Sequence, residues 1–114
     1  MTEPFKLFDD SLSMVSPLEG SSAQFVTGGT VSVAKWALQE GAIIPRHDHV
    51  NEQIVNILSG TLWMRVGDDE YHLDPGESLV IPSGVRHEGR ATTDVVCIDV
   101  FSPPRDDYAS LMST

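Results

Sequence analysis

The sequence predicts an all-β protein. Short segments rich in Val, Ile, Leu, Thr and aromatic residues recur along its 114 residues, separated by Gly and Pro corners. Within them apolar and polar positions alternate with the two-residue period of a strand; Leu62, Met64 and Val66, for example, alternate with Trp63 and Arg65. Many short strands joined by Gly and Pro turns are typical of a sandwich or barrel.

Six segments are predicted as strands, in chain order Thr30–Leu38, Gln53–Leu58, Thr61–Val66, Glu70–Leu73, Ser78–Ile81 and Asp94–Phe101. Gly67–Glu70 is predicted as a hairpin loop. Helical periodicity is weak except over Arg105–Met112. The length corresponds to one domain, with an N-terminal arm and first strands over 1–30, a barrel over 31–103 and a C-terminal tail over 104–114.

Composition excludes several classes of partner. Seven basic residues against 17 acidic ones give a formal net charge of -10, so we expect no binding to nucleic acid or to an anionic membrane. The single cysteine, Cys97, excludes an intrachain disulfide and fits a reducing compartment. No apolar run approaches the length of a membrane span, and residues 1–16 lack the pattern of a signal peptide. We therefore expect a cytoplasmic protein.

Two of the four histidines form a His-x-His pair, His47 and His49. Residues two apart on a strand point to the same face, so both imidazoles can reach one metal ion. The alternative is a pair of exposed polar residues at the end of a strand. His72 has no partner at ligand spacing and is interpreted as a surface histidine on a strand.

The last predicted strand carries an unusual carboxylate. Alternation places Asp99 and Phe101 on one face with Val95 and Cys97, opposite a wholly aliphatic face. Because a carboxylate on an apolar strand is unfavourable unless it is paired or solvated, Asp99 is either the partner of an arginine or a functional group. Residue types alone favour core packing for Phe101 and a surface position for Arg105, and they favour packing for Cys97 as well.

The frame around the histidines resembles a known family. Gly41, His47-x-His49, Gln53 and Gly60 resemble the first cupin motif, and the run Gly76-x5-Pro82-x-Gly84-x2-His87 resembles the second. The resemblance covers residues 41 to 91, and it implies a jelly-roll barrel, the double-stranded β-helix, with one metal site inside. The usual cupin patterns have Glu where this chain has Gln53, and Asn where it has Ala91.

A narrower resemblance concerns the end of the chain. Asp99-x-Phe101-Ser-Pro-x-Arg105, together with the histidine motif, resembles the pectin-degradation cupins of the KdgF type, which convert 4,5-unsaturated monouronates to their linear, ketonised form. By similarity the metal ligands are His47, His49, Gln53 and His87, and the catalytic residues are Asp99, Phe101 and Arg105. A shifted register would make Glu52 the oxygen ligand, but its parity relative to the histidines favours Gln53.

Imidazole with one oxygen suits one divalent Zn, Ni, Fe, Co, Cu or Mn ion without choosing among them. In the resulting hypothesis Asp99 carries protons, Phe101 offers a flat surface to the sugar ring and Arg105 binds the carboxylate of a sugar-acid substrate. Arg46, Arg86 and Arg90 would add positive charge to the mouth of the site. The alternatives are another small metal-dependent cupin enzyme, a dioxygenase or an isomerase, and a non-catalytic cupin that binds a sugar or a small acid. We expect a homodimer, because small jelly rolls leave sheet edges to cover.

Overall fold

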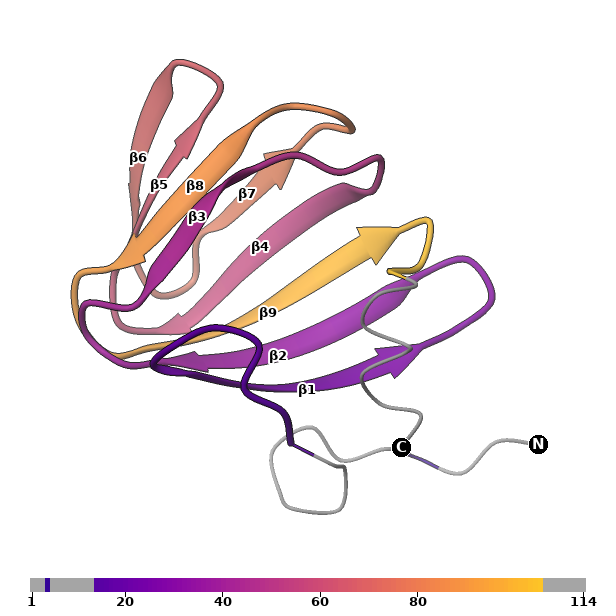
Figure 1. Cartoon of the computed structure of the whole chain (residues 1–114), viewed down its shortest axis with the longest axis horizontal. Helices are drawn as coiled ribbons and strands as arrows, with labels where there is room; N and C mark the ends of the chain where they lie inside the picture. Colours follow the sequence, from indigo (N-terminus) through magenta and orange to yellow (C-terminus); the bar gives the residue numbers. More distant parts are fainter. Residues whose placement is uncertain (1–3, 5–13, 106–114) are drawn as a thin grey trace.

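The computed structural model describes residue 4 and residues 14–105, and within them the chain forms nine strands in two antiparallel sheets (Figure 1). The strands are β1 (Ser21–Thr27), β2 (Ser32–Leu38), β3 (Ile43–His47), β4 (Glu52–Ser59), β5 (Leu62–Val66), β6 (Asp69–Leu73), β7 (Ser78–Ile81), β8 (His87–Ala91) and β9 (Val95–Ser102). The five-stranded sheet has the order β1-β2-β9-β4-β7 and the four-stranded sheet the order β3-β8-β5-β6. This is the all-β jelly roll that the sequence predicts.

All six predicted strands are present, as β2, β4, β5, β6, β7 and β9, with ends that shift by at most two residues. Three further strands, β1, β3 and β8, were not among them. Strands β3 and β8 contain Pro45 and Gly89, residues that are rare inside strands, so their sequences lack the expected pattern. The helical pattern over Arg105–Met112 and most of the predicted C-terminal tail lie outside the described residues.

Turn chemistry agrees with the sequence at two sites. Strands β5 and β6 pair from Val66↔Asp69 onward, so a hairpin is present where predicted, but its loop is Gly67 and Asp68 alone and not Gly67–Glu70; Gly67 has φ 59°. Gly60, between β4 and β5, has φ +79°, and a Cβ there would lie 1.9 Å from the backbone oxygen of Asp94. Only glycine fits that corner, because both the backbone conformation and the close approach exclude a side chain.

The core lies between the two sheets, and its composition follows from strand alternation. On the central strand β9 the residues Val95, Cys97, Asp99 and Phe101 are buried, whereas Val96, Ile98 and Val100 are half-buried on the outer side. The face that carries the carboxylate is therefore the inner one. Adjacent β2 and β4 turn their own buried residues to the same side, because Trp36 pairs with Cys97 and Val55 with Asp99.

The described part of the chain contains no helix of the length and apolar character needed to cross a membrane.

Candidate metal centre and adjoining cavity

Three histidines converge at one end of the space between the sheets. His47 is the last residue of β3, His49 lies in the loop that follows, and His87 is the first residue of β8. One ligand atom from each lies within 4.8 Å of the other two. The centroids of the His47 and His87 rings are 4.2 Å apart, and those of His49 and His87 are 4.8 Å apart. The three residues are positioned to bind a metal ion.

Contrary to the prediction from sequence, His47 and His49 do not lie on one strand. The sequence argument placed both on one strand, but β3 ends at His47 and its pairing with β8 is irregular between Ile44 and His47. The loop that follows brings His49 to the cluster. His72 is exposed on β6, as predicted for a surface histidine, and does not belong to the cluster.

A backbone carbonyl fixes the tautomer of each ring. The Nδ1 atoms of His47, His49 and His87 lie 2.7, 2.9 and 2.9 Å from the carbonyl oxygens of Pro45, Asn51 and Val85. A carbonyl oxygen only accepts, so each Nδ1 carries the proton and each Nε2 keeps its lone pair. This is the arrangement expected of three histidines that bind a metal through Nε2.

Burial favours the neutral form of His49 and His87. Burial lowers the pKa of His87 to about 4; the hydrogen bond with Val85 opposes this shift, and the charges of His47, His49 and Arg105 add to it. Burial also lowers the pKa of His49, and the positive charge of Arg105 lowers it further. The Nε2 atom of His87 is buried and has no hydrogen-bond partner among the described residues. A buried, unpartnered lone pair is unfavourable by itself, and a bound cation would satisfy it.

Gln53 supplies an oxygen to the same point. It is buried on β4, whereas Glu52 beside it is exposed, so strand parity turns Gln53 toward the cluster. Its Oε1 lies 3.1 Å from the Nε2 of His49. With Nδ1 of His49 protonated, both atoms are acceptors, and two acceptors at this separation fit two ligands that face one cation better than they fit a hydrogen bond.

Gln53 also connects the cluster to Asp99. Its Nε2 donates to Oδ2 of Asp99 at 3.2 Å, while Oδ1 of Asp99 has no partner in the described part of the chain. The Asp99 side chain is 8% exposed. Burial raises its pKa from 3.8 to about 7, against the lowering effects of Arg105 and of the Gln53 hydrogen bond. The site therefore holds a carboxyl group that can exchange a proton near neutral pH.

Phe101 and Arg105 lie next to each other beside the histidines. The guanidinium carbon of Arg105 is 4.9 Å from the centroid of the Phe101 ring, and that ring is 5.8 Å from the ring of His49. Phe101 is 1% exposed and does not line the cavity described below. In this structure Phe101 packs against His49 and Arg105, and its contact with a sugar ring stays a prediction.

Asn51 has a positioning role that sequence analysis missed. Its side chain is buried, and its Nδ2 donates to the carbonyl oxygens of Pro103 and Pro104, just before Arg105. Its own carbonyl accepts from His49. One residue thus holds a metal-site histidine and the segment that carries Arg105. The only signal in the sequence was its place directly before Glu52 and Gln53.

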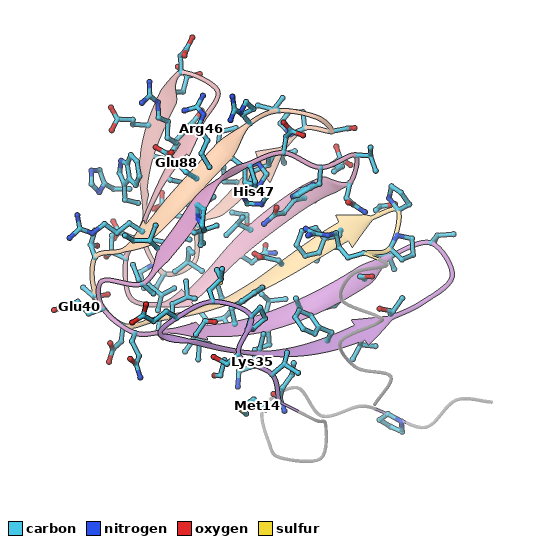
Figure 2. All side chains as sticks on the ribbon, in the orientation of Figure 1. Met14, Lys35, Glu40, Arg46, His47 and Glu88 are labelled. Atoms are coloured by element: carbon cyan, nitrogen blue, oxygen red, sulfur yellow. The ribbon has the colours of Figure 1, made fainter. Side chains whose placement is uncertain are left out.

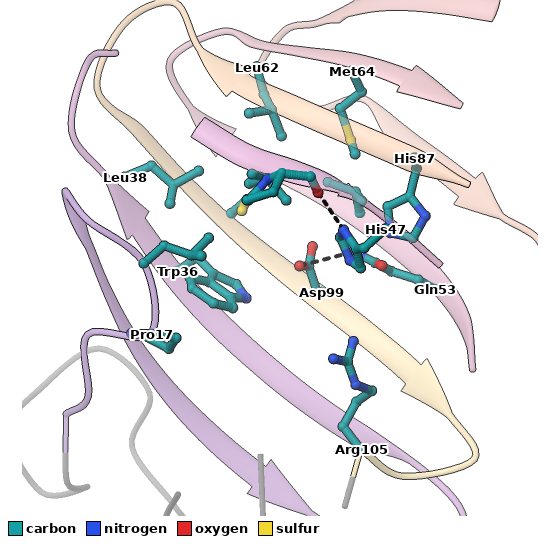
Figure 3. A pocket seen from close by; sticks show the side chains of 15 residues that line it. Pro17, Trp36, Leu38, His47, Gln53, Leu62, Met64, His87, Asp99 and Arg105 are labelled. Atoms are coloured by element: carbon teal, nitrogen blue, oxygen red, sulfur yellow. Dashed lines mark hydrogen bonds between the residues drawn. The ribbon is translucent and has the colours of Figure 1, made fainter. Parts of the chain in front are cut away.

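A cavity of about 270 Å³ adjoins the cluster (Figure 3). It is lined by Pro17, Leu18, Trp36, Leu38, Ile44, Pro45, His47, Gln53, Val55, Leu62, Met64, His87, Cys97, Asp99 and Arg105. Of the four arginines predicted near its mouth, Arg105 alone belongs to this lining. Arg86 and Arg90 are exposed, and so is Arg46, which Figure 2 shows on the four-stranded sheet, whereas the adjacent His47 is half-buried.

Two antiparallel sheets enclosing a three-histidine cluster define a jelly-roll barrel of the metal-binding type. Residues 34–101 match the family model described as "Cupin domain". The chain belongs to the cupin family.

Individual relatives extend this result without naming a reaction. An RmlC-like cupin from Shewanella frigidimarina has a TM-score of 0.86 and 25% identity, over 94% of this chain and 96% of that one. KdgF from a Halomonas species has a TM-score of 0.83 and 24% identity, over 90% and 97% of the two chains, which is a likeness of fold alone. An uncharacterized Streptomyces coelicolor protein is 28% identical over 87 residues, 75% of this chain and 83% of the relative.

Proposed function

We propose that this cupin is a metal-dependent enzyme that moves protons on a small acid, and that its reaction is the conversion of 4,5-unsaturated monouronates to their linear, ketonised form. One observation carries the proposal: the Asp99 carboxyl lines the cavity, is hydrogen-bonded to Gln53 through one oxygen, and has its other oxygen unpartnered among the described residues. A buried carboxyl placed in this way has no evident structural role and is suited to proton transfer.

The residues present fit a divalent ion held by His47, His49, His87 and Gln53. The orphaned Nε2 of His87 and the close approach of Gln53 Oε1 to His49 support this ligand set. When bound, such an ion supplies Lewis-acid polarisation of a substrate oxygen. Because Gln53 adds no negative charge, the ion would keep its full positive charge, which favours oxyanion stabilisation over redox chemistry.

The proposed reaction needs only proton movement. Ring opening moves a proton from the anomeric hydroxyl to the ring oxygen, which becomes an enol hydroxyl. Ketonisation then moves that proton to carbon 4, and the overall composition does not change. Asp99 can accept the proton as a carboxylate and donate it as a carboxylic acid, while the Gln53 amide keeps the carboxyl oriented toward the cavity.

Arg105 is the proposed partner for the substrate carboxylate. It lines the cavity and lies over Phe101, whose ring contacts that of His49, and its planar guanidinium can bind a carboxylate through two hydrogen bonds. This local cation offsets the repulsion that an anionic substrate meets from a chain with a formal net charge of -10.

The test is an ultraviolet assay on metal-reconstituted protein with freshly generated 4,5-unsaturated galacturonate. We expect the conjugated absorbance to decay faster than in buffer. Asp99→Asn abolishes the effect with its metal content intact, whereas Asp68→Asn, at an exposed loop position, behaves as wild type. Decay at the buffer rate with a full complement of metal would reject the reaction.

Two other functions have distinct signatures. A cupin dioxygenase would consume oxygen with its substrate, which the proposed reaction never does. A non-catalytic sugar-binding or acid-binding cupin would retain its ligand affinity in Asp99→Asn and would need no tightly held metal.

We also propose that the protein is a cytoplasmic homodimer. The buried, unpaired Cys97 supports the first statement. The second is supported by the sheet edges at β7, β3 and β6, which pair with no further strand among the described residues. Light scattering at micromolar concentration tests the second, and a monomeric mass would contradict it.

A further inference from the structure

The cavity next to the candidate metal centre is longer than the metal site and changes character along its length. His47, Gln53 and His87 lie on one side of Asp99, and Pro17, Trp36 and Leu38 lie on the other (Figure 3). We call the second region the apolar end and define it by its lining, Pro17, Leu18, Trp36, Leu38, Leu62 and Cys97. Asp99 marks the boundary between the two regions.

Strand register explains this division. Along the inner face of β9, Asp99 pairs with Ala34, Cys97 with Trp36 and Val95 with Leu38. Each step of two residues moves roughly 7 Å along the strand. Measured along β9, Trp36 therefore lies about one such step from Asp99 and Leu38 about two steps. Both steps lead away from the histidines.

The apolar end offers few partners to a sugar hydroxyl. Of its six side chains only Trp36 and Cys97 contain a polar atom. A hydroxyl group buried without a hydrogen bond is unfavourable, because it loses its hydrogen bonds to water. The proposed uronate carries a carboxylate and three hydroxyl groups, so it suits the polar end, where the histidines, Gln53 and Arg105 lie, and it leaves the apolar end unfilled.

Such a space is larger than the voids that packing alone leaves in a protein interior. The whole cavity, at about 270 Å³, corresponds to the volume of roughly nine waters. An apolar compartment that opens onto a polar reaction site fits a ligand with both characters.

We propose that the apolar end is a subsite for a hydrocarbon arm, and that the site takes small 2-oxo or enol acids whose arm is an alkyl or aryl group. The acid and oxo oxygens lie at the polar end, and the arm extends past Asp99 toward Trp36 and Leu38. The inference rests on the proposed function only for the proton transfer at the polar end, which it extends to a second class of substrate.

The first experiment measures dissociation constants by calorimetry on zinc-loaded protein for pyruvate, 2-oxobutanoate, 2-oxopentanoate and 2-oxohexanoate. Each buried methylene contributes about 0.8 kcal/mol, so affinity rises about fourfold per carbon and about sixtyfold across the series. A series that stays flat within twofold, or that falls with length, overturns the proposal.

A matched polar ligand removes the effect of length. The six-carbon acid 4,5,6-trihydroxy-2-oxohexanoate has the same carbon chain with three hydroxyl groups. We expect it to bind at least tenfold more weakly than 2-oxohexanoate, because its hydroxyls would lose their hydrogen bonds to water. Equal or tighter binding of the hydroxylated acid contradicts an apolar subsite.

Trp36 provides a second readout. The chain has two tryptophans, and Trp63 lies outside the cavity with its indole N–H donating to Glu70. In Trp63→Phe the remaining emission comes from Trp36, and it should shift with 2-oxohexanoate but not with pyruvate. Cys97→Leu, which adds volume at the apolar end, should reduce the ratio of the affinities for 2-oxohexanoate and pyruvate. The placement of the arm is refuted if Trp36 emission is the same with both ligands and Cys97→Leu leaves the affinity ratio unchanged.

The experiments distinguish failure of the proposed uronate reaction from failure of the proposed apolar subsite. Turnover of the uronate with a flat 2-oxo acid series removes the apolar subsite and leaves the proposed reaction. An inert uronate with the expected rise in affinity removes the sugar-acid reaction and leaves the subsite.

Discussion

Asp99 lowers the stability of the metal-free protein at neutral pH, and the isosteric change Asp99→Asn measures that effect. The carboxyl group is 8% exposed, and burial raises its pKa from 3.8 to about 7. The native state thus binds a proton over a pH range in which the unfolded chain has released it. Since the acid's pKa is raised on folding, stability falls as pH rises from about 4 to about 7.

The magnitude follows from the pKa values. Between pH 5 and pH 7 the native carboxyl goes from almost fully to half protonated while the unfolded one is ionised. At 1.36 kcal/mol per pH unit for a fully retained proton, this interval corresponds to about 2 kcal/mol. The amide introduced by Asp99→Asn has no such titration, and its oxygen can still accept the hydrogen bond from Gln53. We expect the stability advantage of Asp99→Asn over wild type to grow by about 3 kcal/mol from pH 5 to pH 8.

The assay is urea unfolding of chelator-treated wild type, Asp99→Asn and the exposed control Asp68→Asn at pH 5, 6, 7 and 8. The pKa of His87 is lowered to about 4, so this residue has the opposite effect: it reduces the stability of the protein as pH falls below 6.5. That contribution is common to all three proteins and cancels in the differences between them. A difference between Asp99→Asn and wild type that is the same at every pH refutes the reasoning, because Asp99 would then ionise as readily in the native protein as in the unfolded chain.

Three further predictions follow from the site and the fold. His87→Ala lowers the metal content after reconstitution at least tenfold by mass spectrometry, because it removes one of three clustered ligands, whereas His72→Ala retains full content; equal content in both variants contradicts the candidate centre. Gly60→Ala lowers the free energy of unfolding by more than about 3 kcal/mol because its Cβ meets a backbone oxygen, whereas Gly76→Ala, at φ +87° in open space, lowers it by only about 1–2 kcal/mol, and urea unfolding should separate the two. Cys97 is 3% exposed and burial raises its thiol pKa, so a thiol reagent reacts with it at least a hundredfold more slowly in native protein than in urea; similar rates would show that the barrel opens freely.

Local patterns in the sequence account for much of the fold. Alternation in the segments that became β5 and β9 identified strands because one face of each is buried, and Gly67 and Gly60 marked corners that only a flexible residue can turn. Strands β3 and β8 escaped prediction because they contain Pro45 and Gly89 and owe their strand geometry to pairing with each other and, for β8, with β5.

The candidate site was predicted only in part, for reasons of geometry. His47, His49 and His87 stand in the cupin motifs and meet in space, but His49 arrives from a loop rather than along the strand. Phe101 was assigned to the substrate surface, and the structure buries it beside His49 and Arg105. A residue's identity indicates which contacts it can make, while its exposure depends on what the rest of the chain lays over it.

The sequence by itself determined the all-β class, the cupin motifs and the preference for Gln53 over Glu52, because strand parity and turn chemistry act between residues that are near one another in the chain. Tertiary structure alone decided that the Asp99 face of β9 turns inward, that Gln53 connects the histidines to that carboxyl, and that Trp36 and Leu38 form an apolar end to the cavity. These features depend on contacts between strands far apart in sequence, and such contacts exist only once the two sheets have closed over each other.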